Sequence, residues 1–188
     1  MSAIIVLLLA VLSRALPVAL HQQSWNLSLL GGSLLFLGSR MTSDSPRRAA
    51  LKIAGVLAVL MATDYWITAY GYHYPFHVSG YLITWAWYAG VIVASMGLFR
   101  KITAARVAAG AVITPTSFFL LSNFVVWMGG MYAHTAAGLA QCYTLALPFY
   151  RNDLVSTAIT ATALFGLPAI AARLVDTFHS ASNNNLAA

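Results

Sequence analysis

The sequence predicts an all-α membrane protein built as a single bundle of six transmembrane helices. The first observation behind this prediction is composition, because 60% of the 188 residues are hydrophobic and only 7% are charged. Soluble domains usually carry about 25% charged residues, so this chain has too few to cover a surface in water. The composition excludes a water-soluble enzyme, a disordered chain and a free nucleic-acid-binding domain. The second observation is a series of apolar stretches, since a helix needs about 20 such residues to cross a bilayer.

The chain contains six apolar stretches. The first has no basic segment before it and is interrupted by Arg14, and both features favour a spanning helix over a cleaved signal peptide. The second is short and rich in glycine, so we expect it to tilt or to pack inside the bundle. Pro115 and Pro168 lie within the last two, where a membrane helix tolerates a kink. The stretches are 2–20, 27–41, 50–70, 80–99, 104–128 and 154–175.

The basic residues predict the orientation of the bundle. Eight of the ten lie in the connections after the second and fourth stretches or at the end of the sixth. Lys and Arg concentrate in short cytoplasmic loops, so this side and both termini are predicted to be cytoplasmic. The outer loops are then about 21–26, 71–79 and 129–153 in a single membrane domain, 1–188. The eight residues are Arg40, Arg47, Arg48, Lys52, Arg100, Lys101, Arg106 and Arg173.

The predicted outer side carries four of the five histidines and many aromatic residues. Its third loop is long, and its segment 136–147 has helical composition without the length to span, so an interfacial helix or a re-entrant cap is expected there. Structured loops of this length often carry function. The sequence therefore predicts a basic inner rim and a binding mouth at the outer side.

Asp64 is the only acidic residue deep inside a predicted helix. A carboxylate in the membrane is costly and marks a functional site by default, so Asp64 is a candidate ligand contact. A structural hydrogen bond, or an ion pair with Arg14 or Arg151, is the alternative.

His73 and His77 flank Tyr74-Pro75-Phe76 in the second outer loop. Pro75 argues against a regular helix between them, so a metal cage of several histidines has little support. One imidazole is enough as the axial ligand of a metal already held in a macrocycle. Interfacial histidines without any ligand are the alternative.

Further candidate contacts lie near the predicted outer ends of the later helices. Tyr81, Trp85 and Tyr88 are spaced to share one face of a helix. This face could form a wall for a flat ligand, or it could be the ordinary aromatic belt of a membrane interface. Asn123 and Trp127 share a face near Tyr132, although Asn in a bundle often only joins helices. Arg151 is a possible charge clamp, or the partner of Asp153. No catalytic set of nucleophile and base is visible, so no enzyme is expected, and Cys142 has the setting of an inert buried thiol.

Three stretches resemble the S components of energy-coupling-factor vitamin transporters, and most closely the family of solitary cobalamin-binding BtuM-like proteins. They are Arg14-Ala-Leu-Pro17, residues 64–77, and Ser122-Asn-Phe-Val-Val-Trp127 with its continuation through Gly138-Leu-Ala-Gln-Cys-Tyr143 to Leu147-Pro-Phe-Tyr-Arg-Asn152. The Ala15-x-x-x-Ala19 pattern in the first helix is also similar to the S components, where it implies contact with a coupling subunit.

The resemblance implies a bacterial inner-membrane protein that takes up cobalamin from the outer face, with no resident cofactor of its own and with no nucleic-acid partner. In BtuM-like proteins a loop residue, often Cys, contacts the cobalt. The matching region here has no Cys, so His77 is the expected axial ligand, with His73 as second choice. Asp64 and Arg151 match positions that look like polar contacts to the ligand.

Three other interpretations stay open. The same fold can carry another flat vitamin or haem, the chain can be a structural or assembly protein without a small-molecule site, or it can be a membrane enzyme. The sequence contains no nucleotide-binding motif, so an energising module, if one takes part, must bring its own ATPases.

Overall fold

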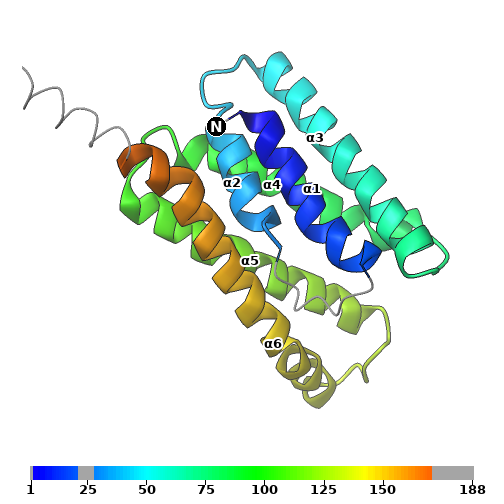
Figure 1. The fold of residues 1–188 in the computed structure, drawn as a ribbon. Coiled ribbons are helices and arrows are strands. Elements are labelled where there is room, and N and C mark those ends of the chain that lie inside the picture. The colour runs from blue at the N-terminus through cyan, green and yellow to red at the C-terminus, as the bar shows by residue number, and fades with distance from the viewer. Residues whose placement is uncertain (1, 21–27, 171–188) are drawn as a thin grey trace, which may run out of the picture.

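The computed structural model describes residues 2–20 and 28–170, and these residues form six helices without any strand (Figure 1). Two π-helical turns extend helices: Ile67–Gly71 continues the third helix and Thr162–Gly166 continues the sixth. A 3₁₀ turn, Val78–Gly80, precedes the fourth helix. The predicted all-α class with six helices is confirmed. The helices are α1 Ala3–Ala19, α2 Leu30–Ser39, α3 Pro46–Trp66, α4 Leu82–Leu98, α5 Ala104–Met128 and α6 Ala136–Ala161.

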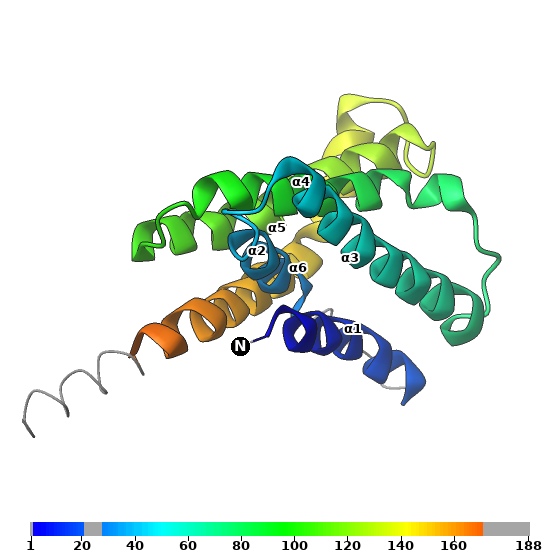
Figure 2. The same ribbon diagram turned by 90° about the horizontal axis from the view of Figure 1, so that it is seen from above.

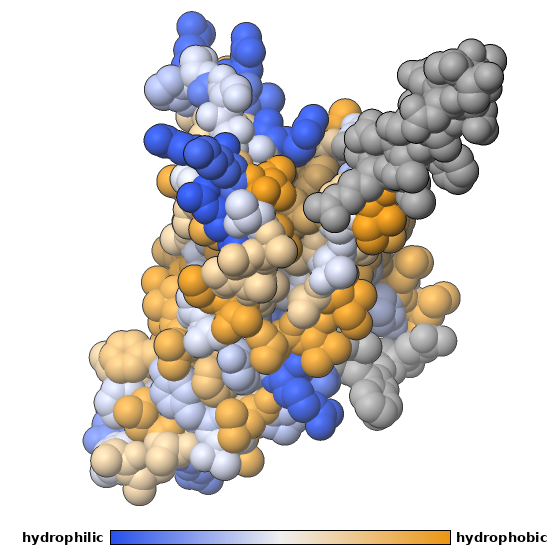
Figure 3. Space-filling model, turned by 90° about the vertical axis from the view of Figure 1, so that its left-hand side faces the viewer, coloured by the Kyte–Doolittle hydropathy of each residue, from blue (hydrophilic) through white to orange (hydrophobic). Residues whose placement is uncertain are grey.

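Three of these helical segments are long and apolar enough to cross a membrane: Pro46–Gly71, Ala104–Met128 and Ala136–Ile170. The helices α1, α2 and α4 are apolar but shorter. Large hydrophobic side chains cover much of the outer surface, and Figure 3 shows hydrophobic residues over the middle of the molecule with hydrophilic ones gathered at its upper end. A surface of this kind is solvated by lipid, as expected of a membrane protein.

The short helix α2 forms the centre of the bundle. All ten of its residues are buried, and it contacts α1, α4, α5 and α6, which surround it in Figure 2. Its glycines allow this, because a Cβ on Gly32 would lie 2.6 Å from the Cβ of Thr160, and one on Gly38 would meet the carbonyl oxygen of Ile92. Small residues let membrane helices approach closely. The expectation that the second apolar stretch packs inside the bundle is confirmed.

One end of the bundle carries the basic connections, and we call it the basic end. There the rings of Phe99 and Phe165 stack with centroids 4.8 Å apart, and Phe36 meets Phe165 edge-on at 5.7 Å. This aromatic contact brings the C-terminal ends of α2 and α4 beside α6. The connections 40–45 and 99–103 therefore lie at the same end of the molecule, which agrees with their predicted placement on one side.

Within the predicted third outer loop, 129–153, the segment 136–147 is helical as expected, but it is the first part of α6 and not a separate interfacial helix or cap. α6 begins at Ala136 and continues through Pro148, so only residues 129–135 connect α5 to α6. Proline removes one backbone donor, but neighbouring groups compensate in membrane helices. Side chains of α5 hold this part of α6 in place, since the ring of Phe119 stacks on Tyr150 with centroids 4.7 Å apart and Tyr143 donates to the carbonyl oxygen of Leu120 at 2.6 Å.

The other predicted boundaries agree with the structure to within a few residues. The non-helical segment between Gly71 and Val78 corresponds to the predicted second outer loop. The predicted first loop, 21–26, and the end of the sixth stretch with Arg173 lie outside the described residues.

Candidate functional site

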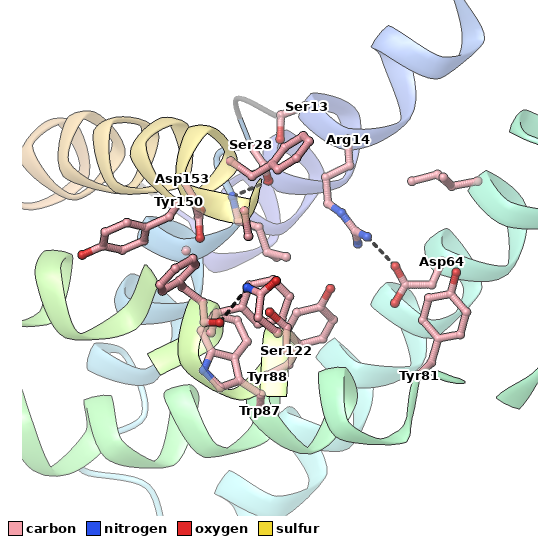
Figure 4. Close-up of a pocket in the computed structure, with 18 of the residues that line it drawn as sticks. Ser13, Arg14, Ser28, Asp64, Tyr81, Trp87, Tyr88, Ser122, Tyr150 and Asp153 are labelled. Atoms are coloured by element: carbon pink, nitrogen blue, oxygen red, sulfur yellow. Dashed lines mark hydrogen bonds and ion pairs between the residues drawn. The ribbon is translucent and has the colours of Figure 1, made fainter. Parts of the chain in front are cut away.

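A cavity of about 500 Å³ opens among the helices, away from the basic end (Figure 4). Its lining comes from the last part of α1, the α3 segment and α5, from the first part of α2 and α4, and from the middle of α6. Successive helices of the bundle run in opposite directions, so the lining parts of α1 to α5 lie toward the end of the bundle opposite the basic end. The volume is within the range of small-molecule sites. Lining residues from α1 to α6 include Arg14, Gly31, Asp64, Tyr88, Asn123 and Asp153.

Arg14 and Asp64 form an ion pair across the cavity wall (Figure 4). The Nη2 of Arg14 on α1 donates to Oδ1 of Asp64, and the indole Nε1 of Trp85 on α4 donates to Oδ2 at 2.9 Å. The Asp64 side chain is only 2% exposed and that of Arg14 is 18% exposed. Among the alternatives for Asp64, the structure shows the ion pair with Arg14. Since three helices share this network, it joins α1, α3 and α4 beside the cavity.

The second terminal nitrogen of Arg14, Nη1, is buried and has no hydrogen-bond partner among the described residues. Leaving a buried donor of a charged group without a partner is unfavourable. Arg14 itself lines the cavity, so a bound molecule that reaches this nitrogen could supply the missing acceptor. The site is thus suited to a ligand that carries a carboxylate or a carbonyl oxygen.

The Ser13 side chain links α1 to the start of α2 beside the cavity. The Ser13 hydroxyl donates to the carbonyl oxygen of Ala10 at 2.8 Å and accepts from the backbone N–H of Leu29 at 3.1 Å. This bond ties the start of α2 to the residue that precedes Arg14. Its effect is to position Arg14 relative to α2.

The α5 and α6 side of the cavity supplies amide, hydroxyl and carboxylate groups. The Nδ2 of Asn123 donates to the carbonyl oxygen of Phe119 at 2.8 Å, and the Asn123 side chain lines the cavity. Asp153 accepts from the Thr157 hydroxyl at 3.5 Å, and Ser122 lies nearby on α5. A ligand in the cavity would therefore meet a cation at one wall and acceptors at the other.

Aromatic rings form much of the remaining wall. Trp87 of α4 packs on Phe118 of α5 with ring centroids 4.7 Å apart, and Tyr150 of α6 stacks on Phe119. Tyr88 completes the α4 side. Flat rings in this arrangement favour a planar ligand, because offset and edge-on aromatic contacts are stabilising.

The family DUF6580, a family of unknown function, matches residues 1–179. The chain belongs to this family. No curated protein and no solved structure matches it.

Three of the predicted ligand contacts line the cavity of this DUF6580 protein, namely Asp64, Tyr81 and Asn123. Trp85 lies buried behind Asp64 and stacks on Tyr81 with centroids 5.7 Å apart. Phe76 stacks on the same tyrosine at 4.9 Å, so part of the predicted aromatic wall is covered by the chain itself. The role of these residues in ligand binding stays a prediction.

His73, Tyr74 and His77 are exposed on the connection between α3 and α4 and do not line the cavity. His73 adopts a left-handed backbone conformation with φ of 56°. Within residues 2–20 and 28–170, no group of three or more His, Cys, Asp or Glu side chains could hold a metal ion. A single imidazole as the axial ligand of cobalt does not need such a group, so that prediction stays open.

Trp127, Tyr132 and Arg151 also lie outside the cavity lining. The indole of Trp127 donates to the carbonyl oxygen of Ala133 at 2.9 Å and thereby closes the connection between α5 and α6. Arg151 is exposed on α6. Ala15 and Ala19 lie on α1, where Ala15 is half-buried and Ala19 is exposed.

Sequence reasoning missed most of the α5 and α6 contribution to the cavity. Phe118, Phe119 and Ser122 have ordinary membrane-helix composition and give no signal of their own. The sequence places Tyr150 and Asp153 in an outer loop, because the segment 136–147 lacks the length to span and the sixth apolar stretch begins only at residue 154. The one available signal was Asp153 itself, a second carboxylate close to an apolar stretch.

Proposed function

We propose that this protein binds a small planar molecule in the cavity and carries it inward across the bacterial cytoplasmic membrane. All six helices span the membrane in this proposal, both termini are cytoplasmic, and the cavity opens outward. The placement of the basic residues supports this orientation. The proposed role is binding and transport, with no reaction catalysed.

The buried Nη1 of Arg14 is the observation that carries the proposal. It has no acceptor among the described residues, and Arg14 lines an aromatic-walled cavity of about 500 Å³. A planar compound with a carboxylate or carbonyl oxygen would pair with it and stack on the rings of Trp87, Phe118 and Tyr150. Uptake follows the resemblance to vitamin S components, and the exposed apolar face of α1 around Ala15 and Ala19 is the proposed contact for an energising module.

A thermal-shift screen of the purified protein tests this proposal. The panel contains riboflavin, thiamine, pyridoxine, nicotinate, cobalamin and haem. We expect one compound to raise the midpoint of unfolding, because a ligand at 100 times its Kd stabilises the folded state by about 2.7 kcal/mol. An analogue of that compound without the acceptor oxygen should give a much smaller shift. If no planar compound shifts the midpoint, the proposed function is wrong.

A corrinoid is the second candidate, and the position of His77 favours it. His77 lies on the connection between α3 and α4, where Tyr72 and Tyr81 at the two ends line the cavity. His77 is exposed. A corrinoid is larger than the cavity, so its macrocycle would lie over the opening, with cobalt facing this connection and a side group directed inward.

Absorption spectroscopy distinguishes this candidate. Cobalamin bound through an imidazole should show a band shift that is lost in His77→Ala, while His134→Ala on the connection between α5 and α6 should retain it. His73→Ala tests the second choice of ligand. An unchanged affinity and spectrum in both His77→Ala and His73→Ala would exclude axial coordination by either residue.

A further inference from the structure

A second cavity, also of about 500 Å³, lies between α4 and α5 on the outside of the bundle. We call it the α4–α5 groove. Its sides are Gly90, Ala94 and Leu98 on α4 and Gly110, Ile113 and Ser117 on α5. Gly90 and Ala94 are exposed and Ile113 is 61% exposed, so the groove is open to the surroundings. Its floor is Leu35 of the central helix, which is buried.

The groove is largely apolar, although three hydroxyl residues, Ser95, Thr114 and Ser117, line it. The Ser95 hydroxyl donates to the carbonyl oxygen of Val91 at 2.7 Å. The Ser117 hydroxyl donates to the carbonyl oxygen of Thr114 at 2.8 Å and accepts from the indole N–H of Trp87 at 3.0 Å. Because the two serine hydroxyls are paired within the protein, the groove is suited to a hydrocarbon occupant.

The length of the groove matches one leaflet of a bilayer. Its lining on α4 runs from Trp87 to Leu98, eleven residue steps, which at 1.5 Å per residue is about 16 Å. The hydrocarbon core of a bilayer is about 30 Å thick, so a single leaflet contributes about 15 Å. One acyl chain lying along the groove would therefore reach from the headgroup level to the bilayer centre.

Basic side chains surround the end of the groove at the basic end. Arg100 and Lys101 follow Leu98 directly in the connection to α5, and both are exposed. Arg106, one turn before Gly110, donates from Nη1 to the carbonyl oxygens of Leu98 at 3.1 Å and Lys101 at 3.2 Å. These bonds hold its guanidinium at the mouth of the groove, and no acidic residue occurs between 98 and 110.

We infer that the α4–α5 groove binds one acyl chain of an anionic phospholipid, whose phosphate lies against Arg100, Lys101 and Arg106. Basic pockets between membrane helices on the cytoplasmic side recognise anionic headgroups in this way. Trp87 lines both this groove and the proposed vitamin cavity, but lipid binding does not depend on the proposed function of that cavity. The lipid belongs to the leaflet at the basic end.

Native mass spectrometry tests the acyl-chain part of this proposal. The full-length protein is extracted from vesicles of phosphatidylglycerol, and retained lipid is counted for the wild type, Gly90→Phe and Gly97→Phe. A Cβ at either glycine meets nothing within 4 Å, so both variants should fold, but only Gly90 lines the groove. We expect one retained lipid in the wild type and in Gly97→Phe, and at least a fivefold loss in Gly90→Phe. Equal retention in all three proteins overturns the proposal.

The headgroup part is tested with vesicles that contain equal amounts of phosphatidylglycerol and phosphatidylcholine with the same acyl chains. The wild type should retain phosphatidylglycerol preferentially. Lys101→Gln should reduce that preference about fivefold, as expected for one basic residue at a membrane surface. Arg47→Gln, which removes an exposed charge from the start of α3, should leave the preference unchanged. A wild type without any preference overturns the assignment to an anionic lipid.

Discussion

Replacing Asp64 by Ala should lower the free energy of unfolding by about 3–5 kcal/mol, the cost of leaving one partner of a buried ion pair alone. The substitution leaves the guanidinium of Arg14 without its counter-charge and removes the acceptor for the indole N–H of Trp85. Asp64→Asn keeps an acceptor oxygen and should cost less. Unfolding in detergent micelles, followed by circular dichroism, measures the difference.

A double-mutant cycle separates the ion pair from simple loss of packing. Arg14→Met combined with Asp64→Leu should cost much less than the sum of the two single substitutions, because the pair disappears without leaving a buried charge. Asp44→Ala serves as the comparison, since Asp44, whose side chain is 10% exposed, pairs at 2.6 Å with Lys52, which is 46% exposed. Exposed pairs contribute only about 0–1 kcal/mol. If Asp64→Ala cost no more than Asp44→Ala, the pair would have no structural role.

Arg14→Lys should weaken ligand binding about 10- to 100-fold, as expected when a hydrogen bond to a charged group is lost. A lysine keeps the charge opposite Asp64, but unlike the guanidinium it has no second nitrogen left to pair with a ligand while it pairs with Asp64. The loss should therefore appear in affinity more than in stability. Titration of the compound identified by thermal shift, followed by Trp fluorescence or calorimetry, measures it.

The matched control for that titration is Arg151→Lys. Arg151 is exposed on α6 and does not line the cavity, so its conservative replacement should leave the affinity unchanged. An affinity loss in Arg151→Lys and none in Arg14→Lys would instead place the anionic or amide group of the ligand near the start of α6.

The sequence predicts the helices well where the apolar composition and the residues at the helix ends agree. α5 matches its predicted stretch because Thr103 caps its start and Gly129 follows its last residue. α2 was expected inside the bundle because it is short and rich in glycine. α6 was predicted poorly because the segment 136–147 is too short to span by itself and polar residues around Arg151 and Asp153 separate it from the next apolar stretch. The structure keeps the helix, because α5 supplies stacking and hydrogen-bond partners for Tyr143 and Tyr150.

The candidate site was predicted in part. A lone carboxylate in an apolar helix singled out Asp64, and Arg14 was one of two partners considered for it. Which arginine pairs with Asp64 depends on how α1 packs beside α3, and no local pattern reports that. Wall residues such as Phe118 and Trp87 belong to the cavity only through the tertiary arrangement, since their composition is that of any membrane helix.

The affinity of Ala146→Trp for the ligand tests most directly whether the cavity is the binding site. Ala146 lines the cavity from α6, and an indole at this position would fill much of it. Ala140→Trp makes the same substitution on the same helix at an exposed position outside the lining. Binding should be abolished in Ala146→Trp and unchanged in Ala140→Trp. Wild-type affinity in Ala146→Trp, with the protein folded, would show that the ligand binds elsewhere.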